Sequence, residues 1–93
     1  MLNLCLNGVY YAKRENSGRL PYMQPGEEVQ IIEEKHNTHD PNALSIRYKK
    51  VHIGYVPAKI THRILVRTAH IARVDMSLRP PLIVIRVEMR DKE

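Results

Sequence analysis

The sequence predicts a mainly β fold: a small OB-like β-barrel of about six strands with one short helix, in a single domain over residues 1–93. Several short runs alternate apolar and polar residues with a period of two, which is typical of half-buried strands. One stretch has helical spacing, whereas a β-α-β sheet needs more helices. A chain of 93 residues with 43% hydrophobic residues is long enough for one core and too short for an enzyme domain plus a regulatory one.

The N-terminal half is predicted to contain two strands separated by polar segments. Alternation over Leu2–Leu6 predicts the first strand, and Gly8 ends it. The polar stretch Lys13–Gly18 is predicted to be an exposed loop. Alternation over Glu27–Glu34 predicts the second strand, and the polar segment Lys35–Asn42 predicts a loop, because its Asp-Pro-Asn sequence favours a tight turn.

The C-terminal half is predicted to contain a hairpin, the helix and two further strands. Two β-rich runs, Ala43–Tyr48 and Val51–Val56, are separated by two lysines and predict an antiparallel hairpin. Helical spacing after a proline predicts a helix from residue 57 to about residue 69. Alternation over Val74–Leu78 and again over Ile83–Met89 predicts the last two strands.

The composition favours a polyanionic partner. Fifteen Lys and Arg against ten Asp and Glu give a formal charge of +5, although such a charge can also serve only solubility. Five tyrosines stand beside no Trp and no Phe, and tyrosine suits a wet binding surface as well as a core. The single Cys5 is predicted to be buried in the first strand. With no targeting segment and no apolar run of about 20 residues, the sequence predicts a cytoplasmic protein without a membrane partner.

Three separated motifs follow one another along the chain. They are Gly8-Val9-Tyr10-Tyr11, then Asn37-Thr38-His39-Asp40-Pro41-Asn42-Ala43, then Ile53-Gly54-Tyr55-Val56-Pro57. In this order they resemble the HIRAN domain family, over roughly residues 4–68. The resemblance implies an OB-like barrel that recognises the 3′ end of single-stranded DNA and needs no cofactor.

The resemblance also implies roles for individual residues. Tyr10 and Tyr11 match an aromatic pair that would stack on bases, although adjacent residues of an extended chain point to opposite sides and either ring could pack in the core instead. Asp40 matches an acidic residue that would accept a hydrogen bond from the 3′-hydroxyl, or it only caps its turn. His39 replaces a usual aromatic residue and can still stack on a base. With His36 it also permits a metal site, but no cysteine is there to complete one.

Cations are needed for the phosphates of a DNA strand. Val9 stands where eukaryotic members of the family often have a basic residue, so other side chains must supply the charge. Of the candidates, Lys59 is near a basic position of the family, and each cation has the alternative role of an ordinary surface charge. The predicted DNA-binding residues are Tyr10, Tyr11, Lys13, Arg14, His39, Asp40, Asn42, Lys59 and Arg63.

The sequence therefore predicts a module that binds single-stranded DNA in repair, replication or phage DNA metabolism, together with a helicase, a nuclease or another DNA-processing protein. The alternative is a protein-interaction domain that keeps the fold and binds a partner through Val9, His39 and the basic helix face. No glycine-rich phosphate loop, HExxH or nucleophile motif is present, so no enzyme activity is expected. Two pairs of adjacent glutamates could still serve a nuclease.

Overall fold

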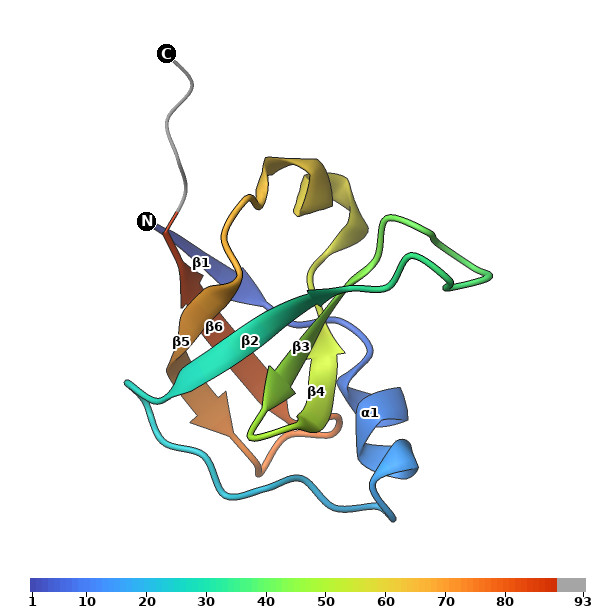
Figure 1. Ribbon diagram of the computed structural model, residues 1–93. Coiled ribbons are helices and arrows are strands. Elements are labelled where there is room, and N and C mark those ends of the chain that lie inside the picture. The colour runs from blue at the N-terminus through green and yellow to red at the C-terminus, as the bar shows by residue number, and fades with distance from the viewer. Residues whose placement is uncertain (89–93) are drawn as a thin grey trace.

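The computed structural model describes residues 1–88, which form one sheet of six antiparallel strands in the order β1-β6-β5-β2-β3-β4. The sheet curls into a half-barrel (Figure 1), which confirms the mainly β prediction. The elements are β1 (Leu2–Cys5), α1 (Val9–Glu15), β2 (Glu28–Glu33), β3 (Leu44–Tyr48), β4 (Val51–Tyr55), the 3-10 helix η1 (Ala58–Arg63), β5 (Thr68–Asp75) and β6 (Leu82–Val87).

Aliphatic side chains on the inner face of the curled sheet form the core. Strand side chains alternate between the two faces, so every second residue of a strand points inward. The fully buried aliphatic residues are Val29, Ile31, Ile46, Ile53, Ile83, Ile85 and Val87. On β1 this alternation buries Leu4 and leaves Cys5 exposed, so the prediction that Cys5 is buried is wrong.

The predicted hairpin is confirmed as β3 and β4. Lys49 and Lys50 form its turn, with φ angles of 47° and 71°. A two-residue turn with both φ angles positive matches the right-handed twist of the flanking strands. Two lysines can therefore make this turn, although they are not residues that favour it.

Helix α1 was not predicted, because Tyr10 and Tyr11 were expected to lie on an extended chain and Lys13–Gly18 in a loop. Seven residues bury just two side chains, Val9 and Ala12, which is too short a pattern to identify a helix. Gly8 precedes the helix with φ of 68°. No helix within residues 1–88 is long and apolar enough to cross a membrane.

The helix predicted over residues 57–69 is wrong beyond its first turns. Residues 58–63 form the 3-10 helix η1, which buries none of its side chains. Residues from Thr68 onward instead pair with β2 and bury Ala69 and Ile71. Because β5 ends at Asp75, the strand predicted at Val74–Leu78 begins too late; the last predicted strand is confirmed over 82–87, and its Met89 lies outside the described residues.

Candidate nucleic-acid interface

The end of β1 meets β4, although these strands lie at opposite edges of the sheet order. The Asn7 N–H donates to the Tyr55 carbonyl at 2.9 Å, and the Tyr55 N–H donates to the Asn7 carbonyl at 2.7 Å. Gly54 permits this approach, because a Cβ there would lie 3.0 Å from the Cβ of Leu6. A Cβ on Gly8 would lie 3.0 Å from the Tyr55 ring. The glycines of the first and third motifs therefore pack these two segments together.

The loop of the second motif is held by its own side chains. Asn37 Oδ1 accepts the N–H groups of His39 and Asp40 at 2.8 and 3.0 Å. Asp40 Oδ1 accepts the Asn42 N–H at 2.9 Å, so Asp40 does cap its turn. Within residues 1–88, no hydrogen bond reaches Asp40 Oδ2. The turn therefore leaves one carboxylate oxygen available to a ligand.

Glu34 connects this loop to β4. Its Oε1 accepts the Asn37 side-chain amide at 3.0 Å and the Tyr55 hydroxyl at 3.1 Å. Burial acts to raise the pKa of Glu34, but these hydrogen bonds outweigh it and the pKa is lowered. Burial and the adjacent Glu34 charge raise the pKa of Tyr55. At neutral pH the pair is thus a carboxylate and a neutral hydroxyl, which suits the hydrogen bond between them.

The three motifs surround a hollow of about 520 Å³, called here the loop pocket. It is lined by Asn7, Tyr11, Asn37, His39, Asp40, Ala43, Tyr55, Val56 and Ala58. The structure thus brings together three predicted site residues, Tyr11, His39 and Asp40. Asn37 and Tyr55 also line the pocket, but they were not among the predicted DNA-binding residues. Both stand in the motifs, so the sequence carried the signal for them.

Tyr10 lines a different hollow, because the tyrosine pair lies on a helix and not on a strand. Successive helical residues are about 100° apart around the axis, and the two rings meet edge to face with centroids 5.7 Å apart. Tyr10 is 54% and Tyr11 66% exposed, so neither packs in the core. The hollow beside Tyr10, about 430 Å³, is called here the basic cleft. It is lined by Tyr10, Lys13, Arg14, Gly18, Arg79, Pro80 and Pro81.

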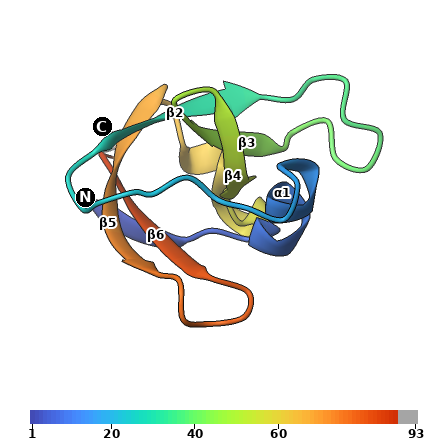
Figure 2. The same ribbon diagram turned by 90° about the horizontal axis from the view of Figure 1, so that it is seen from below.

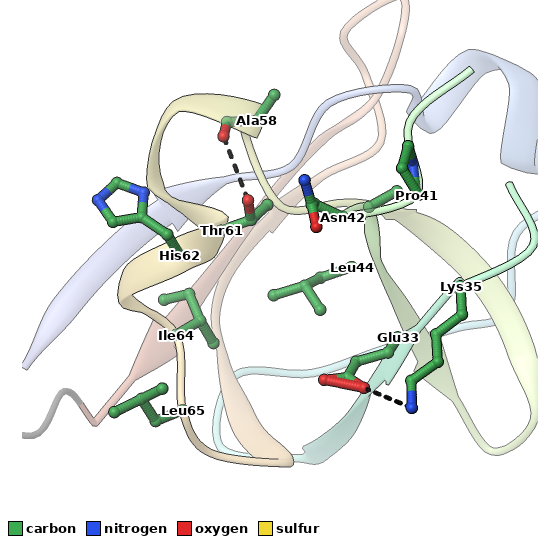
Figure 3. Close-up of a pocket in the computed structure, with 11 residues that line it drawn as sticks. Glu33, Lys35, Pro41, Asn42, Leu44, Ala58, Thr61, His62, Ile64 and Leu65 are labelled. Carbon is green, nitrogen blue, oxygen red and sulfur yellow. Dashed lines mark hydrogen bonds and ion pairs between the residues drawn. The ribbon is translucent and has the colours of Figure 1, made fainter. Parts of the chain in front are cut away.

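A third hollow of about 560 Å³ contains Asn42 and lies between the loop and η1 (Figure 3). It carries both charges, since Glu33 pairs with Lys35 at 3.9 Å on one side. The predicted residues Lys59 and Arg63 are exposed on η1 and line none of the three hollows.

Val9 is buried in α1 with 3% exposure, so it cannot form part of a binding surface. Its side chain instead belongs to the hydrophobic core, where it anchors the first turn of the helix. The prediction that Val9 belongs to a protein-interaction surface is therefore wrong.

His52 fixes α1 against β4, a role that no motif in the sequence indicates. Its buried ring contacts Glu15 Oε1 through Nδ1 at 3.0 Å and the Gly54 carbonyl through Nε2 at 3.1 Å. Both partners are acceptors, so the tautomer of the ring decides to which of them it donates. The ring also meets Tyr55 edge to face at 4.7 Å. His52 thereby sets the position of the helix that carries both tyrosines.

In the two pairs of adjacent glutamates, Glu27-Glu28 and Glu33-Glu34, the side chains that form contacts bind different partners. Glu27 accepts the Tyr48 hydroxyl at 2.8 Å, and Glu33 pairs with Arg67 at 3.2 Å. Within residues 1–88, no group of three His, Cys, Asp or Glu side chains could hold a metal ion. His36 and His39 therefore have no third ligand there.

Comparison with known families agrees with this arrangement. The model of the HIRAN domain matches residues 2–73 of the 93-residue chain, a range that includes all three motifs. No curated protein and no solved structure matches the chain. HIRAN domains are known generally as DNA-binding domains, and this chain belongs to the HIRAN family.

Proposed function

We propose that this protein binds the 3′ end of single-stranded DNA and holds the terminal nucleotide in the loop pocket. The observation that carries the proposal is the meeting of Tyr11, His39 and Asp40 around one hollow. Two of these side chains offer rings for a base, and the third offers a carboxylate for a hydroxyl. The proposed role is binding without catalysis, in the cytoplasm, beside a helicase, nuclease or other protein that supplies the chemistry.

The exposed rings support binding to a single strand. A base must leave its stack before it can lie on a tyrosine or histidine ring, and such stacking contributes about 1–3 kcal/mol per base. Hollows of about 300–1,000 Å³ hold small ligands, so the loop pocket at about 520 Å³ suits a nucleotide and not a duplex.

The free oxygen of Asp40 supports recognition of the strand end. A terminal hydroxyl would donate to Oδ2 while Oδ1 keeps the Asn42 N–H. A hydrogen bond to a charged group contributes about 1.5–3 kcal/mol, and the same charge repels a phosphate. Asn37 and Glu34 hold the loop in this shape through side-chain hydrogen bonds before DNA arrives.

Cations near the pocket would contact the phosphates next to the end. Lys59 follows Ala58, which lines the pocket, and Arg63 lies at the end of η1. Asn42 lies in the neighbouring hollow, which shares Ala43 and Ala58 with the loop pocket. We assign Lys59 and Arg63 to the phosphate of the nucleotide in the loop pocket and Asn42 to a contact at the boundary between the two hollows.

The test compares fluorescence anisotropy of short labelled strands that end in a 3′-hydroxyl or a 3′-phosphate, with a blunt duplex as a third ligand. The wild-type protein should prefer the hydroxyl end and bind the duplex least. Asp40→Asn keeps the acceptor for the Asn42 N–H but loses the charge, so it should narrow the gap between the two ends. Glu28→Gln, an equal charge change at an exposed side chain of β2, should leave the gap unchanged.

Two outcomes would contradict the proposal. Equal affinity of the wild-type protein for strands with a 3′-hydroxyl and a 3′-phosphate would contradict end recognition. Binding to no oligonucleotide would favour the protein-interaction alternative, whose affinity should depend little on salt, whereas phosphate contacts weaken steeply as salt rises.

A further inference from the structure

The basic cleft joins two segments that are far apart in sequence. Lys13 and Arg14 belong to the last turn of α1, and Arg79 belongs to the turn between β5 and β6. Figure 1 shows that turn and α1 at the same end of the half-barrel, and the view from below in Figure 2 agrees. Tyr10 and two prolines complete the lining. The fold thus gathers three cations and an aromatic ring around one hollow.

The charge of this cleft is not neutralised by neighbouring carboxylates. Within residues 1–88, the ion pairs use Lys35, Arg47, His52 and Arg67, and none uses a cation of the cleft. Glu15, the acidic residue of α1, is engaged by His52. The Arg14 guanidinium lies 5.8 Å from the centre of the Tyr10 ring. Cations beside an aromatic platform are the combination with which proteins hold single-stranded nucleic acid.

The two tyrosines link this cleft to the loop pocket. Tyr11 lines the pocket and Tyr10 the cleft, with ring centroids 5.7 Å apart. Stacked nucleotides follow each other at about 3.4 Å along a strand, so a slightly extended strand brings consecutive bases to both rings. The ring planes are 78° apart. Bases on both rings cannot remain stacked on each other, so the strand must turn between them.

We propose that the basic cleft is a second DNA subsite, which takes the phosphates of the nucleotides directly 5′ of those in the loop pocket. The position of this subsite on the 5′ side rests on the proposed 3′-end recognition. The ability of the cleft to bind a polyanion does not rest on it. The competing route would carry these further nucleotides onward over η1, past Lys59 and Arg63. Next to that route lies the hollow whose cation, Lys35, is already paired with Glu33, whereas the basic cleft has no acidic lining residue.

The experiment measures binding of a dinucleotide and of a strand of about ten nucleotides, both with a 3′-hydroxyl, over a range of salt concentrations. Each phosphate neutralised on a single strand adds about 0.7 to the salt slope, which corresponds to about fivefold in affinity between 1 M and 0.1 M salt. Arg79→Gln should cost the long strand about that factor and leave the dinucleotide unchanged. Arg79→Lys should keep the long-strand affinity, and Lys13→Gln with Arg14→Gln should reduce it further.

The matched control is Arg86→Gln. Arg86 is exposed near the far end of β6, paired with Asn3 of β1, so it is remote from the turn that carries Arg79. Its loss should leave both ligands bound as before. If Arg86→Gln and Arg79→Gln lose the same affinity for the long strand, only the net charge of the protein matters and the proposal is overturned.

The remaining outcomes separate the cleft from the function on which it rests. If the dinucleotide binds and the long strand binds no tighter, or if Lys59→Gln and Arg63→Gln remove the gain with length, the cleft is wrong and end recognition stands. If the long strand binds equally well with a 3′-hydroxyl and with a 3′-phosphate, and Arg79→Gln weakens both, the cleft stands and end recognition fails. Binding of neither ligand contradicts both.

The turn between the two rings has its own signal. Two adjacent 2-aminopurines at the 3′ end give an exciton-coupled circular dichroism that depends on their stacking. The wild-type protein should abolish this signal on binding, and Tyr10→Leu should retain part of it. A fully retained signal with the wild-type protein would show that the strand does not turn at Tyr10.

Discussion

Gly54 is the residue through which the fold of β4 shapes the proposed DNA site. Its φ of 156° lies where side chains are rarely tolerated, and a Cβ there would lie 3.0 Å from Leu6 Cβ and 3.1 Å from the Asn7 carbonyl oxygen. Replacement by alanine should therefore cost about 1–3 kcal/mol of backbone strain and about 1–3 kcal/mol of overpacking. Small domains have a total stability of about 5–15 kcal/mol, so Gly54→Ala should be severely destabilised.

Equilibrium urea unfolding, followed by circular dichroism, measures this loss. The matched control is Gly26→Ala, because Gly26 also has a positive φ, 93°, yet a Cβ there would meet nothing within 4 Å. The difference between the two variants isolates the close approach of β4 to Asn7, which should contribute about 1–3 kcal/mol. If Gly54→Ala loses no more stability than Gly26→Ala, the tight packing of the first and third motifs is wrong, and with it the positioning of Tyr55 in the loop pocket.

The remaining predictions concern acid stability and the cysteine. The pKa of Glu34 is lowered in the folded state, so its stabilisation is complete above the unfolded pKa of about 4.3 and is lost as pH falls through the folded value. Glu34→Gln should flatten the decline of unfolding free energy between about pH 6 and about pH 3, and an unchanged decline would exclude the Glu34 network as its cause. Cys5, being exposed, should react with a thiol reagent under native conditions nearly as fast as in urea; slow labelling would contradict the register of β1.

The period of two predicted the strands because the curled sheet buries one face of each of them. It failed where two periodicities overlap, between Ile60 and Ile71. There Ile60, Ile64 and Thr68 have helical spacing, but the N–H of Ile31 donates to the carbonyl of Arg67 at 2.8 Å, and pairing with β2 continues from Thr68. The edge of β2 has backbone groups that need hydrogen-bond partners, and a local sequence pattern does not show this need. The start of β5 could therefore not be predicted from its own residues.

The site was predictable in its motifs and not in its geometry. The second motif has the turn chemistry that the structure shows, with Asn37 and Asp40 each accepting a backbone N–H two residues on. The tyrosine pair was treated as extended chain, which would place one ring on each side of a strand. As part of α1 the rings open onto two adjacent hollows. The contacts of His52 depend on long-range packing, which no local signal reports.

Affinity and end selection should be separable in this domain. One or two stacked bases contribute about 1–3 kcal/mol each, whereas association costs at least about 4 kcal/mol, so the loop pocket alone should bind a dinucleotide weakly. Phosphates in the basic cleft would add affinity without contacting the terminus. The ratio of affinities for hydroxyl and phosphate ends should then stay constant in Arg79→Gln and change in Asp40→Asn, since Asp40 lies in the loop pocket and Arg79 in the basic cleft. On the two proposals together, this domain would select strand ends through a small, preformed pocket and hold them through charge that salt can screen.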